Sequence, residues 1–410
     1  MSAPAPRRLT DYEPIIGKSR VEELRLLGDR LRGRRISCLY PERPGQGPAR
    51  TMASLAPLLE DLGLAVRCHP LRPPAELEPA IAKLRSALQG VGEPMSRETF
   101  CVLFEDGWQP ALDIDGELLF MHDPEALLAA RAVAARAVQR IWRCSLDLSR
   151  AHPDAWHALK QLAQSCELVA YSSPAFVQPV SAHQVLIPPS IDPLRPEHAD
   201  LEADVVGAIL EELQVPLDRP LVAQVCPVEV LRDPLTALEV FRRVRRTTKS
   251  RLVLAFEGSE EAWRPAELAE IQDHARREPD VHLLLLPPGS ERQKNALQRA
   301  ATVILQTPVR HGFGLAVAEA LWKGRPVVGF VSGGIPLQIA HRYTGWLAHS
   351  IEGAASAVIH CLRNAEESKR LGAQGREHVR ENFLITRQLR DYLVAWLIVG
   401  LQDDVIRLDG

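Results

Sequence analysis

The sequence predicts an α/β protein made of two doubly wound, parallel-sheet domains with a cleft between them. The chain has 410 residues, which is too long for one ordinary hydrophobic core and suits two domains. Short apolar runs alternate with helical segments, as expected for parallel strands joined by helices. A proline-rich segment, 188–193, breaks both patterns near the middle of the chain. We therefore expect domains at 1–187 and 188–380, followed by a C-terminal helix at 381–410 that packs back across the domain junction.

The first half of the chain opens with the strand, loop and helix order of an α/β domain. An amphipathic helix is expected over 9–33, because leucines recur there at helical spacing among arginine and glutamate. The strands expected after it are 35–40, 99–105, 118–121, 167–171 and 184–187, and the helices are 49–62 and 124–143.

The second half repeats this alternation with continuous Val, Ile and Leu runs, which are typical of parallel strands buried on both faces. A short helix is expected over 204–213, followed by strands at 221–226, 252–256, 281–286, 302–305 and 326–330, and the clearest helix between them is 235–246. The final helix carries one apolar stripe, which must be buried against another element. The stripe consists of Leu389, Tyr392, Leu393, Trp396 and Leu397.

The composition restricts the kinds of molecule that the protein is expected to bind. A formal charge of −3 gives no general attraction to nucleic acid or to an anionic membrane. The seven cysteines form no CxxC pair and no Cys/His cluster at metal-ligand spacing, so we expect free thiols, a reducing cytoplasm and no metal. The apolar run 392–401 is too short to span a membrane. The oligomeric state is left open, and a homodimer is compatible with the sequence.

The strongest local motif is the segment 310–320, which follows an expected strand and opens an expected helix. Gly312 and Gly314 allow the backbone to approach a ligand closely. The amino terminus of the helix then offers unpaired N–H groups and the positive end of its dipole to an anion. Glu319 lies inside that helix. The alternative is that the glycine pair is only a tight loop before a helix.

A second glycine-rich turn favours the ligand-binding interpretation. Gly333 and Gly334 follow the next expected strand, 326–330. Two glycine-rich turns at successive strand ends are typical of a phosphate-binding cleft. The sequence therefore predicts an anion site at these two turns.

In this setting the chain resembles a known family. The segment 312–319, with Gly333 and Gly334 behind it, is similar to the donor site of retaining GT-B glycosyltransferases of the family 4 type. Among these, the chain is most similar to trehalose-forming transferases, which join a nucleotide-activated glucose to glucose. Further matching blocks follow in order along nearly the whole chain, at 11–13, 16–17, 122–124, 142–144, 147–149, 188–193 and 295–300.

The resemblance implies a GT-B architecture and a set of ligands. The donor would be a nucleotide sugar such as ADP-glucose or UDP-glucose, the acceptor a small sugar, and neither a cofactor nor a metal is implied. Glu319 would hold the donor ribose, while Arg232 would neutralise the leaving phosphate. The residues implied to surround the nucleotide are Gly45, Gly47, Arg232, Gly312, Phe313, Gly314, Leu315, Glu319, Gly333 and Gly334. The catalytic candidates are His311, Arg232 and Asp123.

Three positions depart from the family pattern. His311 stands where the family has a glutamate that supports positive charge on the transferred sugar, so a stabilising negative charge is absent there. Pro227 replaces an arginine that clamps the donor diphosphate, whereas Arg232 keeps the charge of the second clamp residue. Ser145 replaces a histidine on the acceptor side. Loss of one charge-assisted hydrogen bond costs about 1.5–3 kcal/mol.

Asp123 has two interpretations. As part of His122-Asp123-Pro124 at a strand end, it could contact the acceptor or the donor sugar. Alternatively, it caps the helix that begins at Pro124. Trp108 and Trp142 are expected in the core, with sugar stacking as the alternative.

The sequence thus leaves two functions open. The first is an active, retaining hexosyltransferase in which the departing phosphate assists the acceptor hydroxyl, while the enzyme supplies position and electrostatic field. The second is a catalytically impaired homologue that serves as a sugar-nucleotide sensor or as the partner of an active enzyme.

Overall fold

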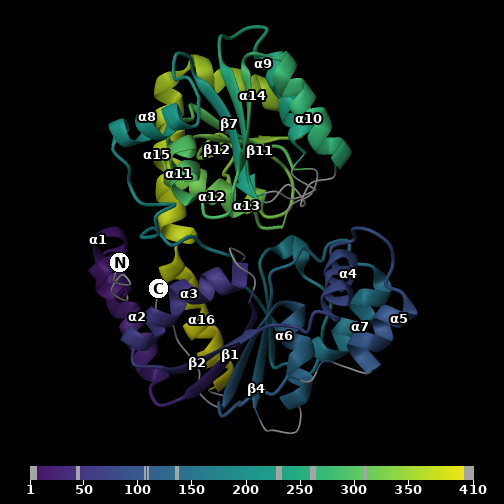
Figure 1. Ribbon diagram of the computed structural model, residues 1–410. Coiled ribbons are helices and arrows are strands. Elements are labelled where there is room, and N and C mark those ends of the chain that lie inside the picture. Colours follow the sequence, from purple (N-terminus) through teal and green to yellow (C-terminus); the bar gives the residue numbers. More distant parts are fainter. Residues whose placement is uncertain are drawn as a thin grey trace. The chain divides into compact units, whose positions relative to one another are not determined.

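The computed structural model describes residues 7–42, 47–105, 108, 110–133, 138–227, 233–258, 265–308 and 312–400. The chain forms two compact units. Unit 1 consists of Met1–Pro189 together with Ile385–Gly410, and unit 2 is Ser190–Leu384. The chain therefore leaves unit 1 once and returns to it with its last helix (Figure 1).

In the described part of unit 1, six parallel strands form one sheet in the order β2-β1-β3-β4-β5-β6. Their bounds are β1 (Arg35–Pro41), β2 (Ala65–Leu71), β3 (Leu118–His122), β4 (Gln139–Cys144), β5 (Leu168–Tyr171) and β6 (His183–Leu186). Every residue of β3 and β5 is buried, as expected for the middle strands of a sheet covered on both faces.

Helices cover both faces of this sheet. One face packs on α4 (Glu78–Leu88), α6 (Asp123–Ala129) and α7 (Pro153–Ala163), which share a core with β1, β3, β4 and β5. On the other face, α3 (Gly47–Asp61) contacts β1 and β2, α16 (Ile385–Gly400) contacts β4 and α3, and α2 (Lys18–Arg30) packs on α16. The short helices are α1 (Glu13–Ile16), α5 (Arg97–Phe100), three 3-10 turns at Leu9–Tyr12, Ala130–Val133 and Pro174–Phe176, and a π-helix at Cys101–Glu105.

The C-terminal helix α16 packs into unit 1. Tyr392 and Trp396 are fully buried and meet the ring of Phe120 on β3, with centroids 4.7 and 5.6 Å away. The Arg34 side chain donates a 2.8 Å hydrogen bond to the Gly400 carbonyl at the end of the helix. The expected apolar stripe is thus buried against the sheet of unit 1.

Three expectations about local structure were wrong. The segment 99–105 is helical, because Cys101–Glu105 forms a π-helix after α5. The alanine-rich stretch expected as one helix over 124–143 instead ends with strand β4, in which Ile141 and Trp142 are fully buried. The helix expected over 9–33 is interrupted at Gly17, whose φ of +83° ends α1.

In the described part of unit 2, a second six-stranded parallel sheet has the order β12-β11-β10-β7-β8-β9. Its strands are β7 (Leu221–Pro227), β8 (Arg251–Glu257), β9 (Val281–Leu286), β10 (Val303–Gln306), β11 (Val327–Phe330) and β12 (Gly345–Ala348). Their apolar runs explain why sequence periodicity located β7 to β11 well.

The helices of unit 2 also lie on both faces. Those that pack with α9 (Pro234–Val244) on one face are α10 (Pro265–Arg277) and α14 (Ile351–Arg363). The remaining helices are α8 (Ala203–Glu212), α11 (Glu291–Ala300), α12 (Leu315–Trp322), α13 (Ile335–Gln338) and α15 (Ala365–Asn382). Every described helix is too short or too polar to span a lipid bilayer.

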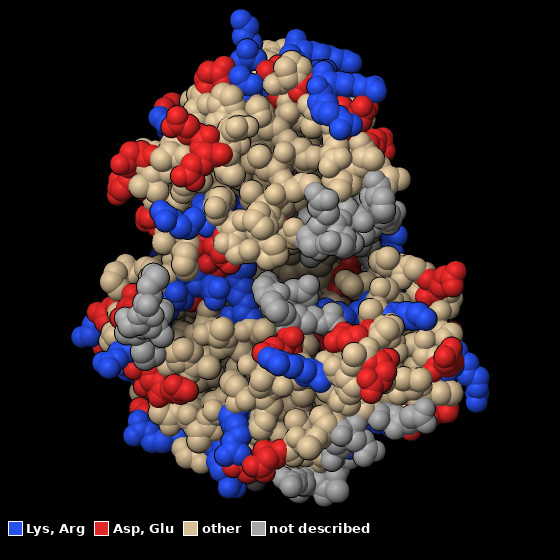
Figure 2. Space-filling view, viewed as in Figure 1, with Lys and Arg blue, Asp and Glu red and all other residues tan. Residues whose placement is uncertain are grey.

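Acidic and basic side chains are interspersed on the visible surface of each unit (Figure 2). This mixing agrees with the small net charge of −3. A bound anion must therefore be held by local groups rather than by the field of a whole face.

Candidate functional site

Each sheet has a topological switch point, where strand order reverses and ligands of open α/β sheets usually bind. In unit 2 this point lies between β7 and β10, and in unit 1 between β1 and β3. The glycine-rich segment 312–314 follows β10, and Asp123 follows β3. Strand order thus places both sequence-predicted groups at the edges where ligands are expected.

The first glycine-rich turn of unit 2 leads directly into α12. Gly314 is the N-cap residue of the helix and adopts a left-handed conformation, with φ of 82° and ψ of 58°. Phe313 is buried and its ring lies 5.7 Å from that of Phe383. The amides of Leu315 and Ala316 are the first two of the helix, so they have no acceptor within it. They are available to an anion at this end of α12.

The two glycine-rich turns touch each other. The amide of Gly334 donates a 3.0 Å hydrogen bond to the carbonyl of Gly312. A Cβ atom at Gly334 would lie 2.6 Å from the Phe313 carbonyl oxygen, so only glycine fits this close approach. The structure therefore brings together the two turns that the sequence predicted to form one site, at neighbouring helices α12 and α13 (Figure 1).

Gln338 of α13 stabilises the first glycine-rich turn and the start of α12 through hydrogen bonds. Its Nε2 donates to the carbonyls of Phe313 and Gly314, at 2.7 and 3.2 Å, and its Oε1 accepts the amide of Ala318 at 2.9 Å. Because Gln338 is fully buried, the loss of these bonds would leave several backbone groups unpaired. No sequence signal marks this residue, since a single glutamine in a short helix carries no pattern.

Glu319 lies on α12, with its side chain half-buried. Gln298 of α11 donates to Glu319 Oε2 at 3.4 Å, and Lys323 donates to Gln298 Oε1 at 2.6 Å. The carboxylate is therefore held from one side by α11.

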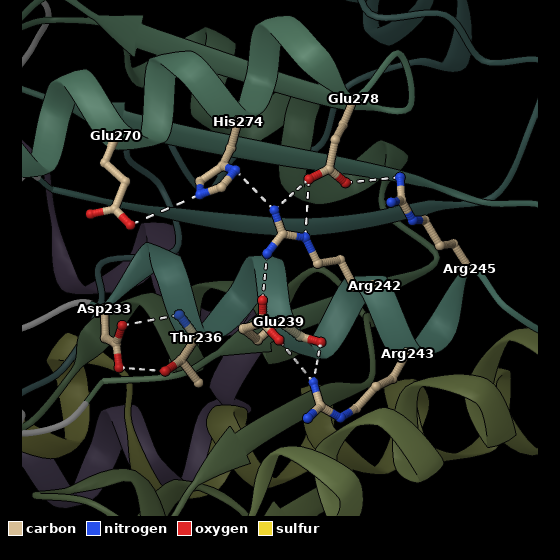
Figure 3. Close-up of polar contacts among 9 residues, drawn as sticks. All are labelled: Asp233, Thr236, Glu239, Arg242, Arg243, Arg245, Glu270, His274 and Glu278. Atoms are coloured by element: carbon tan, nitrogen blue, oxygen red, sulfur yellow. Dashed lines mark hydrogen bonds and ion pairs between the residues drawn. The ribbon is translucent and has the colours of Figure 1, made fainter.

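The start of α9 is tied to the end of β10. Asp233 adopts a left-handed conformation, with φ of 48°, and its Oδ1 and Oδ2 accept the amide and hydroxyl of Thr236 at 3.0 and 2.6 Å (Figure 3). The Thr307 hydroxyl donates to the Asp233 carbonyl at 2.9 Å. Gln224 of β7 donates to the same hydroxyl at 3.4 Å. These bonds connect elements on both sides of the switch point.

Ion pairs hold α9 against α10 (Figure 3). Arg242 donates to Glu278 Oε1 through Nε at 3.0 Å and Nη2 at 2.6 Å. Nη2 also lies 2.9 Å from His274 Nδ1, which must accept because arginine can only donate. The hydrogen bond to Glu278 is the main cause of a raised Arg242 pKa. This network fixes the helix that Asp233 caps.

In unit 1, Asp123 is buried at the end of β3 and has a φ of +62°. Its Oδ1 accepts the backbone amide and the hydroxyl of Ser145 at 2.8 and 2.5 Å. Its carbonyl accepts from Trp142 Nε1 at 3.0 Å. The alternative in which Asp123 caps the following helix was wrong, because its side chain instead bonds Ser145 after β4.

Asp123 and Glu125 share a half-buried arginine, Arg85. Arg85 Nη1 lies 3.5 Å from Asp123 Oδ2 and 3.0 Å from Glu125 Oε1. Burial acts to raise the pKa of Asp123, but the charge of Arg85 and the hydrogen bonds from Ser145 outweigh it, so the pKa lies below its usual value. Asp123 is therefore ionised at neutral pH.

His122 precedes Asp123 and is also buried. Its ring contacts Phe120 and Tyr392, with centroids at 4.8 and 5.9 Å. Burial, followed by the charge of Arg143, lowers the pKa of His122 to about 3. The imidazole is therefore neutral, and its Nε2 has no hydrogen-bond partner within the described residues.

Several predicted residues lie elsewhere or outside the described residues. Gly47 is the first residue of α3 rather than part of a loop. Pro227 is the exposed last residue of β7. His311, Arg232 and Gly45 lie outside the described residues. Trp108 and Trp142 are buried in the core of unit 1.

Comparison with known proteins gives the family. A model described as "Trehalose synthase, N-terminal domain" matches residues 42–178, and one described as "Glycosyl transferases group 1" matches residues 208–378. The chain is 31% identical over 402 residues to the trehalose synthase of Pyrococcus horikoshii, covering 94% of this chain and 95% of that protein. The chain belongs to the trehalose synthase family of glycosyltransferases.

Solved structures agree at the level of the fold. An α,α-trehalose 6-phosphate synthase from Burkholderia multivorans has a TM-score of 0.69 and 14% identity, covering 90% of this chain and 99% of that one. An Anabaena protein in complex with UDP-glucose has a TM-score of 0.62 and 15% identity, covering 89% and 99%. At these identities the likeness shows the GT-B fold alone. In the present chain, the residues matched by the "Glycosyl transferases group 1" model include both glycine-rich turns and Glu319.

Proposed function

We propose that the protein transfers a hexose, with glucose as the first candidate, from a nucleotide diphosphate sugar to a sugar acceptor, with retention of configuration. The observation that carries the proposal is the contact between the two glycine-rich turns, through the hydrogen bond from Gly334 to Gly312. This contact sets the first amides of α12 at the carboxyl edge of the sheet, where a diphosphate would accept their hydrogen bonds.

The chemistry needs no protein nucleophile. The bond between the anomeric carbon and the diphosphate oxygen breaks, and a bond from that carbon to the acceptor oxygen forms on the same face. The acceptor proton passes to the departing phosphate oxygen, so charge and atoms balance. The α12 amides would stabilise the negative charge that develops on the diphosphate. Glu319 would accept hydrogen bonds from the donor ribose, with its carboxylate held by Gln298.

We propose that Asp123 contacts a sugar, either the acceptor or the hexose of the donor. Its carboxylate is ionised, and Ser145 and Arg85 hold both of its oxygens. Such a group is suited to accept a hydrogen bond from a sugar hydroxyl and unsuited to donate a proton.

Binding and transfer are tested in sequence. ADP, UDP, GDP and their glucose conjugates are screened by thermal shift, and a ligand at one hundred times its Kd should add about 2.7 kcal/mol of stability. The best conjugate is then incubated with glucose, and the product and its anomeric configuration are read by NMR. If no nucleotide shifts the transition, the proposal fails.

The same assay tests the catalytically impaired alternative. Stabilisation without transfer, unrescued by His311→Glu combined with Pro227→Arg, would contradict the enzymatic proposal and leave a sensor. Appearance of transfer only in the double variant would locate the defect in those two positions. As a control, Pro227→Ala removes the proline without adding a charge.

A further inference from the structure

Among the described residues of unit 2, four glutamine side chains are buried, and one of them differs from the other three in its hydrogen bonding. Three are bonded: Gln224 to Thr307, Gln298 to Lys323 and Glu319, and Gln338 to the two glycine-rich turns. Gln306 is fully buried, yet within the part of the chain that the structure describes neither its Nε2 nor its Oε1 has a hydrogen-bond partner. A buried amide with no partner is costly, so such a group requires an explanation.

The position of Gln306 follows from strand register. It is the last residue of β10, at the carboxyl edge of the sheet. Val303 and Leu305 of the same strand belong to the core with α9 and α14, so alternation places Gln306 on the opposite face. Its register partner on β11 is Gly329.

That face is covered by α13. A Cβ atom at Gly329 would lie 2.8 Å from Ile335 and 3.0 Å from Ile339, so this short helix packs directly on the strand beside Gln306. The same helix begins after Gly334 and carries Gln338. The unpaired amide is therefore next to the two glycine-rich turns, 312–314 and 333–334. Together these turns form a cradle at the start of α12.

The chemistry of the amide selects the ligand group. A carboxamide offers N–H donors and a carbonyl acceptor, and in Gln306 both lack a partner among the residues that the structure describes. A phosphate at neutral pH only accepts, so it would leave the carbonyl unmatched. A hydroxyl both donates and accepts. We propose that Gln306 is a ligand-binding residue that recognises a hydroxyl group of the sugar nucleotide, either on the ribose or on the transferred hexose.

This inference rests on the proposed function, because it requires a sugar nucleotide in the cradle. It predicts opposite effects on stability and on binding. Gln306→Met conserves shape and removes both polar groups. The unliganded protein should keep its Tm or gain a few degrees, because an unpaired amide is removed. The same variant should bind the sugar nucleotide about tenfold more weakly, because two hydrogen bonds are lost.

The test uses the full chain and isothermal titration calorimetry with ADP, UDP and GDP and with their glucose conjugates. A loss confined to the glucose conjugate places the contact on the hexose, and an equal loss with the nucleotide alone places it on the ribose. Gln338→Met is the matched control, because its amide is fully bonded and its Tm should fall.

Two results would overturn the inference. Unchanged affinity of Gln306→Met for both ligands would mean that water or nothing satisfies the amide. A lower Tm of the unliganded variant would mean that Gln306 already has a partner in the free protein. Failure of the proposed function is distinguishable from both results: the wild-type protein would then either bind none of the six compounds or bind them without transferring glucose, and in the second case the affinities of Gln306→Met still test the contact.

Discussion

His122 is buried and neutral because an aromatic environment and the nearby charge of Arg143 disfavour its protonation. Its pKa is about 3 in the folded chain and about 6.5 when unfolded. As pH falls below 6.5, the unfolded state therefore binds a proton that the folded state does not. Stability is present above the unfolded pKa and is lost as pH falls toward the folded one.

Because of this histidine, we expect the free energy of unfolding of unit 1 to fall by about 2 kcal/mol between pH 7 and pH 5. His122→Gln should remove that part of the acid sensitivity, as measured by urea denaturation at both pH values. His183→Gln, at an exposed residue of β6, is the control. An equal loss on acidification in wild type and His122→Gln would contradict the prediction.

Two substitutions of Asp123 distinguish its effect on stability from its effect on transfer activity. Asp123→Ala removes a fully buried carboxylate that pairs with the half-buried Arg85 and should lower the free energy of unfolding by about 3 kcal/mol. Asp123→Asn should lower it less, because asparagine tolerates the left-handed backbone and its amide oxygen can still accept from Ser145. Both variants should lose transfer activity if the carboxylate contacts a sugar. Full activity of Asp123→Asn would exclude that contact.

At the scale of elements, the cradle depends on how closely α12 and α13 approach. Gly334→Ala would place a methyl group 2.6 Å from the Phe313 carbonyl, so the turn must shift. We expect a loss of about 2 kcal/mol in stability and a weaker thermal shift with nucleotide. Gly312→Ala is the matched control for stability, because a Cβ atom there meets nothing within 4 Å. Equal destabilisation by the two variants would show that close packing at Gly334 is not the cause.

At the scale of the whole molecule, unit 1 depends on a helix that is separated from its other part by the 195 residues of unit 2, which occupies 190–384. Trp396→Ala should lower the stability of unit 1 by about 3–5 kcal/mol, because a fully buried ring is lost from α16. Hydrogen exchange should then rise in β3 and β4 and stay unchanged in β10. The control is Ile398→Ala on the same helix, whose side chain is 44% exposed. Faster exchange in both units would show that α16 supports both.

The fold could be predicted where local pattern and burial agree. The apolar runs of β7 to β11 are buried on both faces, so their composition reveals them. The edge strand β2 was missed because all its residues except Leu71 are exposed or half-buried and it contains Pro70. Strand β4 was assigned to a helix because alanine-rich sequence before it favours one. Its pairing with β3 and β5 overrides that local preference.

The sequence by itself determined the α/β class, the glycine-rich turns and the helix that follows the first of them, because these depend on neighbouring residues. Only the tertiary structure decided which distant side chains meet: Gln338 bonds the turn at Gly314, Ser145 bonds Asp123, and Gln306 has no hydrogen-bond partner among the described residues. Those contacts join residues far apart in the chain, and their geometry is set by strand order and packing, which no local pattern encodes.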